Sequence, residues 1–137
     1  MIRTTLTTVA AGLVAATLGS AALTQPAQAG GQIAVSIAPA SADGDHAMRT
    51  GLALYSLFNN VKSGGIRQIG TGNAAGLAQN GSGNLGIVHQ EGSGHNGTLT
   101  QNGNGNAHGL FQFGKNTYGH VAQNGNGNTG ATFLFGW

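Results

Sequence analysis

QNGNGN stands at residues 101–106 and again at 123–128, and QNGSGN at 79–84 is nearly the same, so this string recurs with a 22-residue period. A looser version begins 11 residues before each of these strings: QIGTGN, QEGSGH and QFGKNT, at residues 68, 90 and 112. A short fixed period is typical of a solenoid, whose units bury their apolar sides by stacking on their neighbours. We therefore predict an all-β repeat region: a cross-β, two-stranded solenoid of about three 22-residue coils.

Glycine marks the positions where the chain is expected to reverse. It lies two positions after every repeat glutamine and usually again at four. Glycine adopts positive φ at little steric cost, so these positions favour tight turns and leave about seven residues per unit for a strand roughly 23 Å long. The predicted turn glycines are Gly70, Gly81, Gly92, Gly103, Gly114 and Gly125.

Alternation along each strand predicts which side chains face inward. The residue nine positions after each glutamine is usually branched and apolar, and it shares a face with the glutamine itself. The residue two positions before it on that face is mostly glycine, so two strands could pack closely around a narrow interior. The predicted core residues are Leu77, Val88, Leu99, Leu110 and Val121.

Stacked coils about 4.8 Å apart place each residue above the one 22 positions earlier. Side-chain amides would then form ladders along the stack, each amide donating to one neighbour and accepting from the other. An unpaired amide in a dry interior costs about 1–3 kcal/mol, so such ladders would also penalise a slip in register. The predicted ladder residues are Gln68, Gln90 and Gln112; Gln79, Gln101 and Gln123; and Asn84, Asn106 and Asn128, with Asn73 at the equivalent position of the first looser unit.

Residues 30–65 lack the repeat and are expected to form a leader or cap. Alternating apolar residues at 33–37 indicate a short strand that ends at Pro39. Asp45 is predicted to cap a helix that runs to about Val61, although an irregular extra strand pair is an alternative. The expected apolar stripe of the helix is Met48, Leu52, Tyr55 and Phe58, with Leu54, Leu57 and Val61 beside it.

Residues 1–29 have the features of a secretory signal peptide. Arg3, the apolar stretch at 6–23 and the Ala-x-Ala site at 27–29 supply its three parts, so we expect cleavage after Ala29 and a secreted protein. A membrane anchor is the alternative, because the apolar stretch is nearly long enough to span a bilayer. An exported chain without cysteine must rely on backbone and side-chain ladders for stability.

Composition argues against a compact enzyme. Charged residues are 6% of the 137 residues and 26 residues are glycine, whereas globular chains average about 25% charged residues and about 7% glycine. Asp43, Asp45 and Glu91 are the only carboxylates, too few to assemble a catalytic group. No two of the five histidines are 22 positions apart, so none stack as metal ligands. We expect no catalytic residues, metal, cofactor, nucleic-acid partner or small-molecule substrate.

The repeat Q-x-G-x-x-N, followed by another glutamine at the same spacing, resembles the curlin repeats of curli, the extracellular amyloid fibres of bacteria. The resemblance covers roughly residues 66–137. It implies a fibre subunit that passes through an outer-membrane secretion pore, polymerises at the cell surface with itself and with a nucleator or major subunit, and serves adhesion and biofilm matrix. This chain departs from the best-known major subunit in having only about three coils and no glycine- and asparagine-rich tag in 30–65.

The residues also favour polymerisation independently, because a stack of coils is expected to have open strand edges at both ends. Phe133, Phe135 and Trp137 form the expected docking edge, and packing beneath the N-terminal helix is the alternative for these aromatic residues. The main alternative function is a monomeric secreted solenoid that binds ice or polysaccharide on a flat face. Thr98 and Thr100 lack the neighbouring threonine rows that ice binding would favour.

Overall fold

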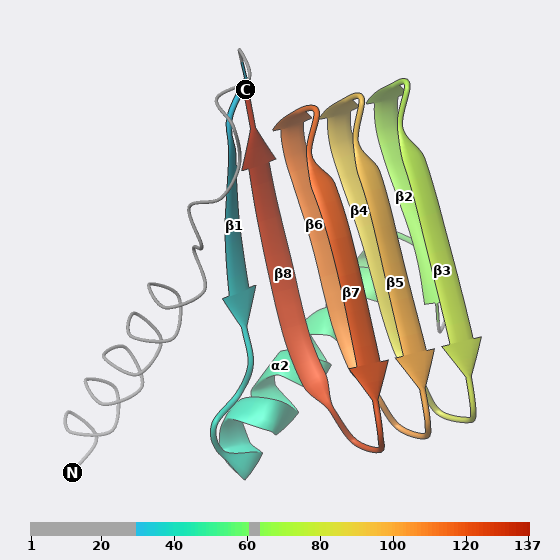
Figure 1. The fold of residues 1–137 in the computed structure, drawn as a ribbon. Helices are drawn as coiled ribbons and strands as arrows, with labels where there is room; N and C mark the ends of the chain where they lie inside the picture. Colours follow the sequence, from blue (N-terminus) through green and yellow to red (C-terminus); the bar gives the residue numbers. More distant parts are fainter. Residues whose placement is uncertain (1–29, 61–63) are drawn as a thin grey trace, which may run out of the picture.

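Pairs of repeat units form flattened coils that stack in register in the computed structural model (Figure 1), which describes residues 30–60 and 64–137. The predicted signal peptide at 1–29 and the predicted helix end at Val61 lie outside the described residues. The elements are β1 (Gln32–Ile37), α2 (Ala42–Phe58), β2 (Gly64–Thr71), β3 (Ala74–Asn80), β4 (Leu85–Ser93), β5 (Asn96–Asn102), β6 (Ala107–Lys115), β7 (Tyr118–Asn124) and β8 (Thr129–Gly136).

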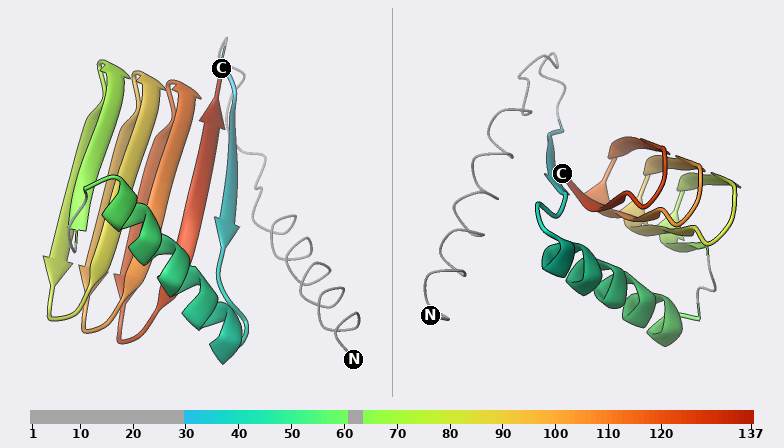
Figure 2. Two further views of the ribbon diagram at one scale, coloured as in Figure 1. Left: turned by 180° about the vertical axis from the view of Figure 1, so that it is seen from behind. Right: turned by 90° about the horizontal axis from the view of Figure 1, so that it is seen from below.

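Two sheets form the walls of the solenoid. The five-stranded sheet has the order β1-β8-β6-β4-β2, and the three-stranded sheet has the order β3-β5-β7. All pairs within the repeat are parallel and share a 22-residue offset, as in Val88 opposite Leu110 and Gln101 opposite Gln123. The right view of Figure 2 looks along the strands, and it shows the coils side by side with α2 against one wall. The predicted two-stranded solenoid of about three 22-residue coils is confirmed.

Turns between the strands use the two glycines of each G-x-G segment. Gly103 has φ of 117° and Gly105 has φ of 67°, and Asn116 (φ 53°) takes the second position in the QFGKNT unit. A Cβ added at Gly103 would lie 2.0 Å from the carbonyl oxygen of Gly125 in the next coil. Glycine at the first position therefore serves both the turn and the close stacking. All six predicted turn glycines have positive φ: Gly70, Gly81, Gly92, Gly103, Gly114 and Gly125.

A narrow apolar core fills the inside of the solenoid. Val88, Leu99 and Leu110 are each 0% exposed, and Leu134 of β8 joins them at 2%. Leu134 stands in the column that carries glutamine in the other repeat strands of its sheet, since it pairs with Gln112. The other predicted core residues, Leu77 and Val121, are only partly buried, because β3 and β7 are the outermost strands of the three-stranded sheet.

Helix α2 lies against the outer face of the five-stranded sheet (Figure 2), and a second apolar cluster lies between them. Leu52 of the helix is 5% exposed. It packs with Ile87, Ala107, Phe111 and Ala131, and Met48, Tyr55 and Phe133 surround this cluster. The helix thereby covers an apolar wall that the repeat pattern alone did not predict.

The helix begins earlier than expected. Its N-cap is Ser41, whose hydroxyl accepts a hydrogen bond from the backbone N–H of Gly44 at 3.2 Å. Asp45 lies in the first turn and pairs with Arg49 at 2.8 Å, so the prediction that Asp45 is the cap is wrong. Phe58 is 83% exposed and does not belong to the buried stripe.

Strand β1 pairs antiparallel with β8 and covers its outer edge. The register places Ile33 opposite Phe135 and Val35 opposite Phe133. Backbone hydrogen bonds between Gly31 and Trp137 of 3.0 and 3.1 Å extend the pairing beyond the strands. The expectation of an open docking edge at Phe133, Phe135 and Trp137 is therefore corrected: their backbone already has a partner.

Candidate functional site

Two rows of glutamine amides run through the solenoid parallel to the stack. In one row Gln68 donates to Gln90 at 2.7 Å and Gln90 to Gln112 at 2.8 Å. In the other, Gln79 donates to Gln101 at 2.9 Å and Gln101 to Gln123 at 2.7 Å. In each bond the donor is the side-chain nitrogen of the coil that comes earlier in the chain, and the acceptor is the side-chain oxygen of the next coil.

Interior glutamines use their second amide proton as well. Gln90 also donates to the backbone oxygen of Ala74 at 2.8 Å, and Gln101 to that of Leu85 at 3.1 Å. Both glutamines are 0% exposed. Each amide therefore links the strand to the coil above and to the opposite wall, and a slipped register would leave buried amides without partners.

The asparagine row is built differently from the glutamine rows. The side-chain oxygen of Asn84 accepts the backbone N–H of Asn106 at 2.9 Å, and that of Asn106 accepts the N–H of Asn128 at 3.0 Å. Their side-chain nitrogens donate to glycine carbonyls of the next coil: Asn84 to Gly103 at 2.9 Å and Asn106 to Gly125 at 2.8 Å. The expectation of amide-to-amide bonds is corrected here, because these side chains bind the backbone of the turns.

The equivalent position of the looser units carries a mixed row of different residues. Asn73 accepts the backbone N–H of His95 at 3.0 Å, and His95 Nδ1 lies 2.7 Å from the hydroxyl oxygen of Thr117. His95 and Thr117 are 1% and 0% exposed. Residue type did not indicate this row, but the 22-residue spacing of the three positions does.

Three strand edges of the solenoid lack a neighbour among the described strands (Figure 1). At one end both β2 and β3 are open. At the other end β7 is open, whereas β8 is covered by β1. Ile66 and Ile69 on β2 are 44% and 40% exposed. Unpaired backbone N–H and C=O groups on such edges can add a further strand.

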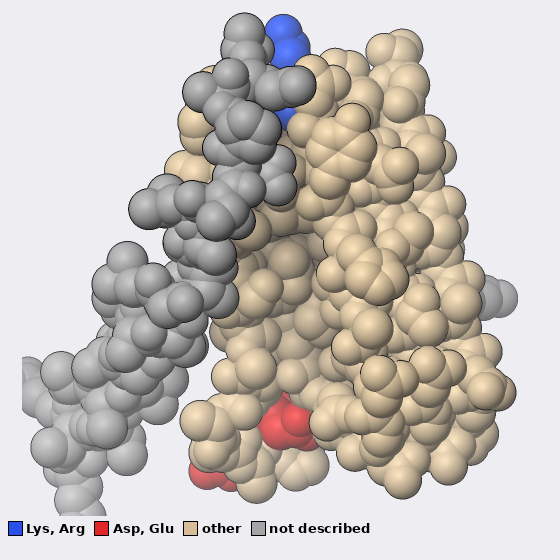
Figure 3. All heavy atoms as spheres, in the orientation of Figure 1, with Lys and Arg blue, Asp and Glu red and all other residues tan. Residues whose placement is uncertain are grey.

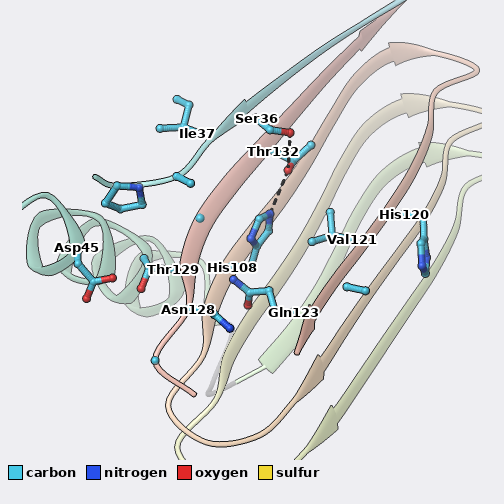
Figure 4. Close-up of a pocket in the computed structure, with 15 residues that line it drawn as sticks. Ser36, Ile37, Asp45, His108, His120, Val121, Gln123, Asn128, Thr129 and Thr132 are labelled. Atoms are coloured by element: carbon cyan, nitrogen blue, oxygen red, sulfur yellow. Dashed lines mark hydrogen bonds between the residues drawn. The ribbon is translucent and has the colours of Figure 1, made fainter. Parts of the chain in front are cut away.

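A groove of about 700 Å³ lies beside the open edge of β7. Val121 and Gln123 form one side of it, and Ile37 at the end of β1 contributes to the other (Figure 4). His108 reaches into the groove, with Nε2 3.0 Å from the hydroxyl oxygen of Thr132. The groove is thus the unfilled end of the solenoid interior.

His108 is a buried base with an incomplete set of hydrogen bonds. It is 8% exposed, and its Nδ1 has no hydrogen-bond partner in the structure. Burial disfavours the charged imidazolium and lowers the pKa of His108 to about 4. The imidazole is therefore neutral near pH 7.

Strand β1 also contacts β7, through one side chain. The amide of Gln32 donates to the backbone oxygen of Tyr118 at 3.0 Å and accepts from the N–H of Tyr118 at 2.6 Å. Tyr118 is the first residue of β7. The side chain of Gln32 therefore occupies the backbone groups at the start of the open edge, as a neighbouring strand would.

Arg49 joins the helix to the turns. Its guanidinium donates to the carbonyl oxygens of Gly105 at 2.7 Å and Gly127 at 2.8 Å, which belong to successive coils. Charge is otherwise sparse: Glu91 and Lys115 are the only charged residues from 68 to 137. In Figure 3 the face that carries β3, β5 and β7 shows almost no charged side chains. Copies stacked in register would therefore meet little like-charge repulsion.

In the part of the chain that the structure describes, no three His, Asp or Glu side chains are grouped so that they could hold a metal ion. The same residues include no helix with the length and apolar character needed to cross a membrane. Comparison with protein-family models, with curated proteins and with solved structures gives no match.

Proposed function

We propose that this protein is a structural subunit of an extracellular amyloid-like fibre, and that copies join by pairing the open strand edges of their solenoids. The observation that carries the proposal is the pair of in-register glutamine rows, which lie beside open edges at β2, β3 and β7. The same backbone and amide bonds that join coils within one copy would join coils of neighbouring copies.

The resemblance to curlin repeats supports the same proposal and extends it. A curlin-like subunit would be secreted through an outer-membrane pore, would polymerise at the bacterial surface with itself and with a nucleator or major subunit, and would contribute to adhesion and biofilm matrix. Low charge and regular glycine turns suit such a stack, because neither opposes close approach of identical coils.

A second candidate is a monomeric secreted solenoid that binds ice or polysaccharide. One observation favours it: β1 covers the edge of β8, as a strand that prevents edge-to-edge association would. Its flat face is less suitable, because Thr98 pairs with Gly76 and His120, and Thr100 lies between two alanines, so no regular threonine rows form.

Sedimentation velocity with an amyloid dye separates the two functions. Residues 30–137 contain every described element and are the sample, freshly desalted and followed over hours with and without preformed seeds. The fibre proposal predicts loss of the monomer boundary, a rising dye signal and a shorter lag with seeds. A monomer that persists without dye signal at all concentrations would contradict it.

A further inference from the structure

The two walls of the solenoid end unevenly. Among the described strands, β2, β4, β6 and β8 of the repeat lie in one sheet and β3, β5 and β7 lie in the other. The position beside the free edge of β7, which we name the β7 seat, is therefore vacant, although β8 already extends one layer farther on the opposite wall. The groove of about 700 Å³ marks this seat (Figure 4).

Polar groups at the β7 seat lack the bonds that their counterparts make inside the stack. Gln101 donates both to the opposite wall and to the glutamine above it, whereas Gln123 donates to Ala107 at 3.3 Å and has no glutamine above it in the described residues. Asn106 donates to a glycine carbonyl of the next coil, whereas Asn128 turns back to the oxygen of Asn124 at 3.0 Å. The seat thus has the donors that an added strand with glutamine and glycine would satisfy.

Strand β1 occupies the neighbouring position and also contacts β7. It pairs along its whole length with residues 131–136 of β8, and Gln32 binds both backbone groups of Tyr118 at the start of β7. A strand that entered the β7 seat along its whole length would have to replace the Gln32 contact. A further coil with a strand paired to β8 would have to displace β1 from the edge of β8.

We propose that the β7 seat receives β2 of a second copy, and that β3 of that copy then displaces β1 from β8, so that successive copies are related by half a turn about the stack axis. This inference rests on the proposed function. Half a turn exchanges the two walls and reverses the strand direction, which makes the incoming β2 parallel to β7.

The register of the repeat matches this arrangement. Gln68 of the second copy would stand beside Gln123, and Gly70 of the second copy would present its carbonyl to Asn128, as Gly125 does to Asn106. Simple translation would instead place β2 of the second copy on β8 and leave the β7 seat vacant. Half a turn therefore fills both walls without a gap, and it requires β1 to move at every junction.

A reversible crosslink between β1 and β8 tests the displacement of β1. The hydroxyl oxygens of Ser36 and Thr132 lie 3.2 Å apart on directly paired residues, and the chain has no cysteine. Ser36→Cys together with Thr132→Cys is therefore well placed for a disulfide. Seeded growth of residues 30–137 carrying both changes should stop when the pair is oxidised and resume when it is reduced. Equal growth in both states would overturn the inference.

Gly125→Ala tests the β7 seat independently, with Gly127→Ala as its matched control. A Cβ at Gly125 meets only the side-chain nitrogen of Asn128, at 3.4 Å, whereas a Cβ at Gly103, which has a coil above it, meets a carbonyl oxygen at 2.0 Å. Gly127 and its counterpart Gly105 both have nothing within 4 Å. Gly125→Ala should slow seeded growth at least about tenfold while the monomer stays folded, and Gly127→Ala should have little effect. Similar growth rates for the two variants would contradict occupation of the seat.

Helical reconstruction of the fibres by cryo-electron microscopy gives the symmetry directly. Seven strands shared between two walls predict a rise of about 17 Å per copy with a rotation of about 180°. A rise of about 19 Å without rotation would overturn the inference while leaving the fibre function intact. Failure of the unmodified residues 30–137 to form fibres would instead contradict the proposed function.

Discussion

Gln101 donates one amide proton to Gln123 at 2.7 Å and the other to the backbone of Leu85 at 3.1 Å, and it accepts a bond from Gln79 at 2.9 Å. One buried side chain thus connects three coils and both walls of the solenoid. The same side chain is part of the row that ends at the β7 seat. Stability of the single copy and growth of the fibre are therefore expected to respond together when this row is interrupted.

Gln101→Ala should lower the free energy of unfolding by about 1–3 kcal/mol, because it removes a buried amide and leaves its partners unsatisfied. Asn102→Ala is the matched control, since Asn102 is the exposed next residue of the same strand, with a bond to Asn124. It should change stability by about 0.5 kcal/mol or less. Denaturant titration of dilute monomer measures both. Equal losses would refute the assignment of inner and outer faces.

Gly103→Ala should be more destabilising than Gly105→Ala, although both positions have positive φ. Backbone strain alone costs about 1–3 kcal/mol at such a position, and it is greater at φ of 117° than at 67°, which lies in the left-handed helical region. At Gly103 the added Cβ would also lie 2.0 Å from the Gly125 oxygen, whereas at Gly105 it meets nothing within 4 Å. Thermal unfolding by circular dichroism gives the order. A lower melting temperature for the Gly105 variant would show that close stacking does not constrain the first glycine.

Leu52→Ala should reduce stability by about 2–5 kcal/mol, because it opens a cavity between α2 and the five-stranded sheet. Leu52 is 5% exposed, and Leu57 on the same helix is 73% exposed and serves as the control. Leu57→Ala should cost about 0.5 kcal/mol or less. The comparison uses equilibrium unfolding followed by near-ultraviolet circular dichroism. A helix that contributes nothing to the fold would make the two variants indistinguishable.

Acid should destabilise the single copy through His108. Its pKa is about 4 in the folded chain, below the ordinary value of 6.5, so the unfolded chain binds the proton more readily between these pH values. Stability is therefore full above about pH 6.5, falls as the pH is lowered to about 4, and loses at most about 3 kcal/mol from this group. Denaturant midpoints measured across this range give the slope.

His108→Gln should flatten that slope without abolishing it. Burial also lowers the pKa of His89, which acts with the same sign. Asp45 lines the same groove, but its pKa is lowered from 3.8 by the neighbouring Thr129 hydroxyl and by Arg49, so it titrates below this window. An unchanged slope in the His108 variant would show that His108 is not the group responsible.

The repeat itself was predictable because its physical causes are local and periodic. Glycine spacing determines the turns, and alternation places Leu99 and Gln101 on the inner face of one strand. The 22-residue stacking period then follows from the pairs of QNGxGN strings. These features need no knowledge of contacts that are distant and irregular in sequence.

The 22-residue period does not predict the contacts between the repeat and residues 30–60. Antiparallel pairing of β1 with β8 joins Ile33 to Phe135, at opposite ends of the described chain, and no repeated spacing links them. The position of α2 depends on Leu52, which packs against apolar side chains on the outer face of the five-stranded sheet. In the sequence, the strands that carry these side chains cannot be told from ordinary alternating strands. A search for repeated asparagines does not predict the mixed row through His95. In that row a histidine stands at the position that asparagine has in the other row.

X-ray fibre diffraction of seeded residues 30–137 tests whether copies of this solenoid stack by their strand edges. Stacking by strand edges predicts a meridional reflection at about 4.8 Å, from strands perpendicular to the fibre axis. It also predicts an equatorial reflection at about 10 Å, from the distance between the two walls. The helical signal of α2 should persist in the fibre by circular dichroism. Particles without the meridional reflection, or a chain that stays monomeric, would contradict stacking by the strand edges.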